Sequence, residues 1–215
     1  FRNNVAIGHQ ALDATSTNDI DGTVAIGYQA LTSLTDGNGN TAIGHQALAT
    51  TTTGTNNTAV GFQAADAIPA GAINNTAIGY AALGSGNHAD CDGNTIVGAN
   101  AGSAITSGAN NTCIGINAGD GLATNTRNVM IGAGAEASAN NTANEISIGH
   151  DCQGIGANYA VIGDGNIERL YAADDVGATL YAGSATVQTS DRRIKEDIKD
   201  SVLGLEFVKQ LRAVE

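Results

Sequence analysis

Hydrophobic and polar positions alternate in short blocks that recur along most of the chain. Each block holds three residues, most of them β-branched or small, followed by a glycine, and the glycine returns every 14 to 19 residues. The glycines are Gly8, Gly27, Gly44, Gly61, Gly79, Gly98, Gly115, Gly132, Gly149 and Gly163. A sustained period of this kind is the signature of a repeat architecture, in which each unit packs on its neighbours. The pattern therefore predicts about ten stacked units over residues 1–165.

Aligning the units on these bend glycines shows where the strands lie. The residue before the glycine is always Ile or Val, and the third residue before it is Val, Thr or Ile in the first nine units. Such β-branched residues fit a pleated strand, whereas the Asn and Gly between units favour turns. Each unit of about 17 residues thus predicts one coil of an all-β parallel β-solenoid, or β-roll, with coils stacked at ~4.8 Å.

The predicted strands are apolar on both alternating faces, and only one face can fill the interior of a coil. Aromatic residues make up 4% of the chain and Trp is absent, so the core must be thin. The column between the two β-branched positions is mostly small, and we expect it to allow close approach of another subunit. Parallel association around a threefold axis would supply the missing burial. The sequence therefore predicts a homotrimer.

Two further columns follow the bend glycine and could carry binding. Rings follow the glycine in the first five units, at His9, Tyr28, His45, Phe62 and Tyr80. Amides follow the rings in the first four, at Gln10, Gln29, Gln46 and Gln63. Stacked coils would align both sets into ladders. The ladders are either a stripe that binds a glycan or receptor, or a structural arrangement of stacked rings and paired amides.

Composition narrows the partners and cofactors. The net charge of −12 argues against nucleic-acid binding, which needs a basic face. No apolar run reaches the ~18 residues needed to cross a bilayer, so we expect no membrane insertion in this segment. We expect no metal and no cofactor, because His9 and His45 would lie two coils apart and the cysteines lack clustered partners. The cysteines, which we interpret as small buried or loop thiols, are Cys91, Cys113 and Cys152.

Two other solenoid functions fit the sequence poorly. An ice-binding face usually needs a second parallel column of threonines, and we find only one, at Thr41, Thr58, Thr76, Thr95 and Thr112. A solenoid acyltransferase would repeat an aliphatic residue every six positions, and stepping six residues from Ile7 or Ile43 reaches polar or small residues instead. The N-N-T sequons that recur with the turn are explained by the repeat.

The carboxyl end departs from the repeat. Residues 166–189 have the pattern of short strands or an extended neck. Residues 190–215 carry six acidic and six basic side chains and an apolar stripe at helical spacing, which predicts a helical segment.

The units N-N-V-A-I-G-H-Q-A-L and T-V-A-I-G-Y-Q-A-L resemble the head repeats of trimeric autotransporter adhesins, which also occur in phage tail fibres. This resemblance covers about residues 3–165. It implies a trimeric left-handed parallel β-roll that serves as an adhesive or spacer module. The unit here is longer than that of the family, so we expect longer outer loops.

The motif S-D-R-R-I-K at Ser190–Lys195 resembles the opening of the endosialidase-type intramolecular chaperone, S-D-x-R-x-K. The resemblance implies a domain that drives trimerisation and is then released by self-cleavage, here between Thr189 and Ser190. Ser190 would be the nucleophile and Lys195 the base, with Asp191 and Arg193 as supporting motif residues. The alternative is that Ser190 only caps the following helix.

Together these observations predict a homotrimeric component of a phage tail fibre, located in the virion and serving host-receptor attachment or spacing. The receptor would be a cell-surface molecule, with a glycan as one candidate. The alternative is the head domain of a bacterial trimeric adhesin on the cell surface. Apart from the autocleavage, we expect no enzymatic activity of the metabolic kind.

Overall fold

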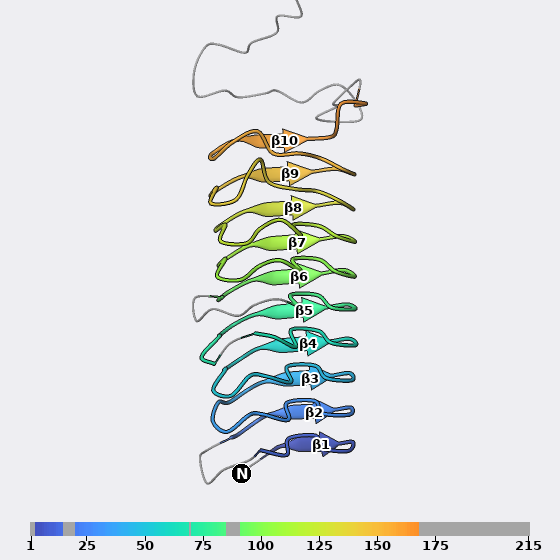
Figure 1. Ribbon diagram of the computed structural model, residues 1–215, viewed down its shortest axis with the longest axis vertical. Coiled ribbons are helices and arrows are strands. Elements are labelled where there is room, and N and C mark those ends of the chain that lie inside the picture. Colours follow the sequence, from blue (N-terminus) through green and yellow to red (C-terminus); the bar gives the residue numbers. More distant parts are fainter. Residues whose placement is uncertain (1–2, 15–19, 69, 85–90, 168–215) are drawn as a thin grey trace, which may run out of the picture. The chain divides into compact units, whose positions relative to one another are not determined.

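The computed structural model describes residues 3–14, 20–68, 70–84 and 91–167, and these form one parallel sheet of ten strands (Figure 1). Strand order follows the chain, so each strand pairs with the one before and the one after it. The strands are β1 Val5–Ile7, β2 Val24–Ile26, β3 Thr41–Ile43, β4 Thr58–Val60, β5 Thr76–Ile78, β6 Thr95–Val97, β7 Thr112–Ile114, β8 Val129–Ile131, β9 Ile146–Ile148 and β10 Ala160–Ile162. The predicted all-β parallel β-solenoid is confirmed. The predicted neck and carboxyl-terminal helix lie outside the described residues.

Register is kept along the whole sheet. Residues at the same position relative to the bend glycine are paired, as Ala42 is with Ala59 and Ala59 with Ala77. Units of different length therefore present identical strands, and the additional residues lie in the return segments between them (Figure 1). Constant register is what allows a column in the sequence to become a column in space.

The middle residue of each strand points into the coil. From Ala25 in β2 to Ser147 in β9 this side chain is buried in every strand. The expectation that the small column would face another subunit is therefore wrong. The coil is narrow, so its interior admits small side chains, and the strand's twofold alternation then turns the β-branched residues outward.

We call the outward-pointing surface of the sheet the outer strand face. It consists of a first column, in which Val and Thr predominate, and a second column of Ile and Val. The first column is Val5, Val24, Thr41, Thr58, Thr76, Thr95, Thr112, Val129, Ile146 and Ala160. The second is Ile7, Ile26, Ile43, Val60, Ile78, Val97, Ile114, Ile131, Ile148 and Ile162. All of these side chains are half-buried or exposed, although the chain has few large apolar residues.

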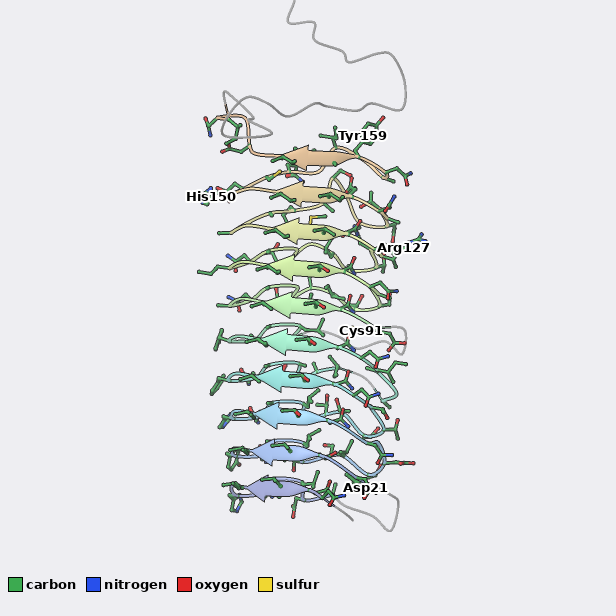
Figure 2. All side chains as sticks on the ribbon, turned by 180° about the vertical axis from the view of Figure 1, so that it is seen from behind. Asp21, Cys91, Arg127, His150 and Tyr159 are labelled. Carbon is green, nitrogen blue, oxygen red and sulfur yellow. The ribbon has the colours of Figure 1, made fainter. Side chains whose placement is uncertain are left out.

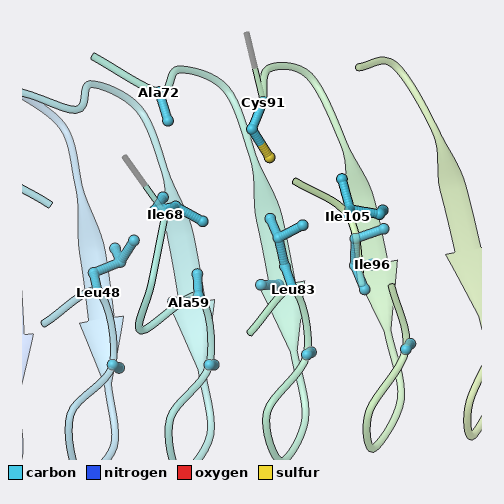
Figure 3. Close-up of a cluster of buried hydrophobic side chains, with 14 of the residues drawn as sticks. Leu48, Ala59, Ile68, Ala72, Leu83, Cys91, Ile96 and Ile105 are labelled. Carbon is cyan, nitrogen blue, oxygen red and sulfur yellow. The ribbon is translucent and has the colours of Figure 1, made fainter. Parts of the chain in front are cut away.

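The interior is filled from the strand on one side and from the return segment on the other (Figure 3). Opposite the alanines of β3 and β5, the return segments supply Leu48 and Leu83. Where β6 carries the larger Ile96, the position equivalent to those leucines is Gly102. A Cβ there would lie 3.1 Å from Ile96 Cδ1. Volume is thus conserved from coil to coil, as close-packed interiors require.

The bend glycine cannot be replaced without moving the neighbouring coil. At Gly44, φ is +140°, and an added Cβ would meet the backbone carbonyl of Gly61 in the next coil. At Gly61 the same contact with the carbonyl oxygen of Gly79 would be 2.4 Å. The invariance of this column therefore comes from close backbone approach between coils.

A second special backbone position lies five residues before the bend glycine. It takes a left-handed conformation in every described coil, with φ of +57° at Asn56 and +60° at Asn74. Asn and Gly adopt this conformation at low cost, which explains the Asn/Gly turn that precedes each strand. Arg127 occupies the position in one coil, with φ of +61°.

Candidate functional site

The five rings that follow the bend glycines form a continuous stack. Successive ring centroids lie 5.6 Å apart for His9 and Tyr28, 5.0 Å for Tyr28 and His45, and 4.7 Å for His45 and Phe62. Phe62 and Tyr80 follow at 5.7 Å with their planes 17° apart. The predicted alignment into a ring ladder is confirmed. Each inner ring has both faces covered by neighbouring rings and presents its edge to solvent.

The glutamines beside the rings form a second ladder, which we call the outer amide ladder. Nε2 of Gln29 donates to Oε1 of Gln10 at 3.0 Å. The next two steps, Gln46 to Gln29 and Gln63 to Gln46, are each 3.1 Å. The predicted alignment of these amides is also confirmed, and their hydrogen bonds are made to one another. Binding of a ligand by the rings or amides stays a prediction.

Sequence reasoning missed a third ladder, the inner asparagine ladder, which lies four residues before the bend glycine. Its members are Asn40, Asn57, Asn75, Asn94, Asn111 and Asn128, all of them buried. Oδ1 of Asn75 accepts from the backbone N–H of Asn94 at 3.0 Å and from its Nδ2 at 3.1 Å. Nδ2 of Asn75 donates to the carbonyl of Cys91 at 2.7 Å. The side chains thus bridge the strand side of the coil to its return segment.

The inner asparagine ladder ends at a buried acid. Glu145 takes the equivalent position after Asn128, and its backbone N–H donates to Asn128 Oδ1 at 2.8 Å. Its carboxylate accepts from the Ser138 backbone N–H at 2.9 Å and from the Thr142 hydroxyl at 3.1 Å. Burial opposes ionisation, but the hydrogen bonds from Ser138 and Thr142 outweigh it and lower the pKa of Glu145. The carboxylate is therefore held charged within the structure.

A pair of acids lies on neighbouring coils, at Asp120 and Glu136. The Glu136 carboxyl accepts from the backbone N–H of Asp120 at 2.8 Å and from that of Gly121 at 3.2 Å. Burial and the adjacent Asp120 carboxyl raise the pKa of Glu136 to about 8. Within the described ranges, no group of three His, Cys, Asp or Glu side chains is placed to hold a metal ion.

The three cysteines are buried and free, as the sequence indicated. Burial raises the pKa of the Cys91 and Cys113 thiols to about 12. Thiols with such pKa values are protonated at neutral pH and act as small apolar groups.

Figure 2 places His150 at the bend edge of the coils, and Asp21 and Arg127 at the opposite, turn edge.

The outer strand face leaves apolar side chains open to solvent along the whole sheet. It extends across all ten strands and combines half-exposed threonines with exposed aliphatic side chains such as Ile43, Ile78 and Ile114. No helix in the described part of the chain is long and apolar enough to span a membrane. No pocket is found among the described residues.

The predicted cleavage residues Ser190, Asp191, Arg193 and Lys195 lie outside the described residues. Comparison of the chain with family models, with curated proteins and with solved structures finds no match.

Proposed function

We propose that the chain is one third of a homotrimeric fibre, of the phage tail-fibre type, that attaches to a host receptor or acts as a spacer. The observation that carries this proposal is the outer strand face. Soluble monomers rarely expose a continuous apolar patch of several hundred Å², and a larger one marks an interaction site. Here the second column is Ile or Val in every strand from β1 to β10, and the first column beside it is Val, Thr, Ile or Ala.

The chemistry of this face favours a second and third copy of the same chain as its occupants. Its repeat is set by the coil spacing, so a parallel copy presents side chains at the same spacing and can match it coil by coil. It carries no charged side chain in either column. A partner recognised through ionic contacts therefore fits this face less well than a second copy of the chain bound through apolar contacts. Interfaces between identical subunits are more apolar than those of transient complexes.

Parallel trimerisation also fits the resemblance of the repeats to trimeric adhesin heads and tail fibres. Three such rods around one axis would bury all three outer strand faces and leave the ring ladders on the bend edges. The motif at Ser190–Lys195 adds the start of a trimerisation chaperone to the same chain. Attachment or spacing then follows from a stiff rod whose coils repeat at ~4.8 Å.

The interface can be tested with matched isoleucines. We expect the double change Ile43→Lys and Ile78→Lys to convert the trimer to monomers, because it places unpaired charges in an apolar contact. Ile73→Lys is the control, since Ile73 is 39% exposed, between Ile43 at 38% and Ile78 at 40%, but lies in the turn before β5. Trimers that persist in the double variant, or that are lost equally in the control, would contradict this interface.

Self-cleavage is tested separately, in a chain that continues through a complete carboxyl-terminal chaperone. We expect two fragments from the unaltered sequence and one intact chain from Ser190→Ala or Lys195→Ala, because the dyad supplies nucleophile and base. Mass spectrometry of the products reports the cut. Cleavage at Thr189–Ser190 in both variants would show that this dyad does not perform it.

A further inference from the structure

The ring ladder stops abruptly at Tyr80. The residue after the next bend glycine is Ala99, and the one after that is Ile116, so a methyl group stands where a sixth ring would be. Backbone bonds keep the register across this break, with Asn100 N–H donating to the Tyr80 carbonyl at 2.8 Å and Asn117 N–H to the Ala99 carbonyl at 3.0 Å. The interruption therefore lies in the side chains, while the coils continue.

One face of the Tyr80 ring is left without a ring partner among the described residues. Its other face stacks on Phe62. Tyr80 is correspondingly 54% exposed, compared with 43% for Tyr28 inside the stack. Tyr80 and the exposed Ile116 lie two coils apart, roughly 10 Å. A six-membered ring above Ala99 would be about 5 Å from each of them, within the range of 4.7 to 5.7 Å that the ladder's own rings keep.

The polar groups beside this break also differ from those lower in the rod. Ala81 ends the outer amide ladder, and Asn100 and Asn117 take the amide position in the next two coils. Within the described part of the chain, the side-chain amides of these two asparagines have no hydrogen-bond partner. Each offers a donor and an acceptor together, the combination that adjacent sugar hydroxyls satisfy.

We propose that Tyr80, Ala99 and Ile116 form a site for a neutral pyranose sugar, stacked on the free face of Tyr80 and hydrogen-bonded by Asn100 and Asn117. The C–H groups of a pyranose face suit the negative face of an aromatic ring. The net charge of −12 disfavours an acidic sugar. This inference rests on the attachment function proposed above and assigns it a location: the break in the ladder, rather than the covered rings below it. A trimer would present three such sites and gain avidity from them.

The test uses the full 215-residue chain and four methyl glycosides, those of glucose, galactose, mannose and N-acetylglucosamine, with saturation-transfer NMR as the readout. We expect at least one of them to bind, and Tyr80→Ala to weaken that binding about tenfold through loss of the stacking platform. Ala99→Tyr should abolish binding by continuing the ring stack into the site. Tyr28→Ala is the matched control, and should leave binding unchanged because that ring is covered on both faces.

The results separate this inference from the fibre proposal. Failure of all four glycosides to bind a chain that sediments as a trimer would overturn the sugar site and leave the fibre intact. Binding that Tyr28→Ala removes, or that survives Ala99→Tyr, would also overturn it. A preference for methyl sialoside over the neutral panel would contradict the choice of a neutral sugar. If Ala99→Tyr instead disrupts a complex between chains, the break is a protein contact and the sugar site is wrong.

Discussion

The solenoid contains two amide ladders that make the same kind of hydrogen bond in different surroundings. The inner asparagine ladder is buried and links both sides of each coil, as Asn57 does through Asn40 and the carbonyl of Ala72. The outer amide ladder lies at the bend edge, and its glutamines pair with one another where solvent can replace a lost bond. An unmade bond costs far more when the remaining partner is buried. Burial, rather than the number of bonds, should therefore decide how much each ladder stabilises the fold.

The largest loss of stability is expected on replacing a bend glycine, which lies along the chain between the inner asparagine and the outer glutamine of each coil. Gly61→Ala places a methyl group 2.4 Å from a backbone oxygen at a φ of +142°. Neither backbone can yield without breaking the coil register, so we expect a loss of about 4 kcal/mol or more in the free energy of unfolding. Gly71→Ala is the control, because its Cβ would meet nothing within 4 Å, although φ is also positive, at +85°. Equal losses in chemical denaturation would show that backbone strain, and not close approach, fixes the column.

The inner asparagine ladder should give the next largest effect. Asn75→Ala leaves the buried backbone N–H of Asn94 without its acceptor and the carbonyl of Cys91 without its side-chain donor. It also removes one of the acceptors of Asn94 Nδ2, which keeps its bond to the carbonyl of Gly108. We expect the free energy of unfolding to fall by about 3 kcal/mol, as for other buried groups left unpaired. Denaturant titration measures it. A loss as small as the one expected below for Gln46→Ala would show that burial does not decide how much each ladder stabilises the fold.

Glu136 and Glu145 differ in their surroundings, so their contributions to stability should change with pH in opposite directions. The pKa of Glu136 is raised to about 8 from its usual 4.5, so its protonated form stabilises the fold. That contribution is complete below pH 4.5 and is lost progressively as the pH rises to about 8. We expect Glu136→Gln to gain stability relative to the unaltered chain as the pH is raised across this range.

Glu145→Gln should behave in the opposite sense. Because its pKa is lowered, the charged form of Glu145 stabilises the fold, and this contribution is lost as the pH falls. The variant should be less stable at neutral pH and approach the unaltered chain in acid. This loss begins only below pH 4.5, so thermal unfolding is compared at pH 3 and pH 8. Raising the pH should make Glu136→Gln more stable, and Glu145→Gln less stable, relative to the unaltered chain; a shift in the same direction for both variants would contradict these assignments.

The smallest effect is expected in the outer amide ladder. Gln46→Ala removes one bond to Gln29 and one from Gln63, but water can satisfy the groups left behind. Gln46 has a left-handed backbone, with φ of +58°. Gln and Ala both carry a Cβ, so this conformation costs about the same with either residue at position 46. We expect a loss of about 0.5 kcal/mol, measured by denaturant titration beside Asn75→Ala.

The period and the β-branched columns were enough to predict the strands, the stacking and the two external ladders, because constant register converts sequence columns into spatial ones. They could not tell which strand face closes the coil. Alternation defines two faces, and the choice between them depends on the coil's width, which is set by residues such as Leu48 and Leu83 in the return segment. The structure, not the pattern, shows that the small residues lie inside.

The inner asparagine ladder was missed because its residues share an ordinary turn composition with their neighbours. In the repeated N-N-T sequence, Asn56 takes the left-handed turn position and the adjacent Asn57 is buried in the ladder. The two roles differ by one residue and need the same amino acid. The usable signal was the fixed distance of four residues to the bend glycine, which a turn alone does not require.

The outward orientation of the β-branched columns leads to the central claim, that two further copies of the chain cover the outer strand face. Sedimentation equilibrium of the unaltered 215-residue chain is its most direct test. We expect a single species of three times the 21.5 kDa chain mass. A folded species that stays at 21.5 kDa at all concentrations would contradict it.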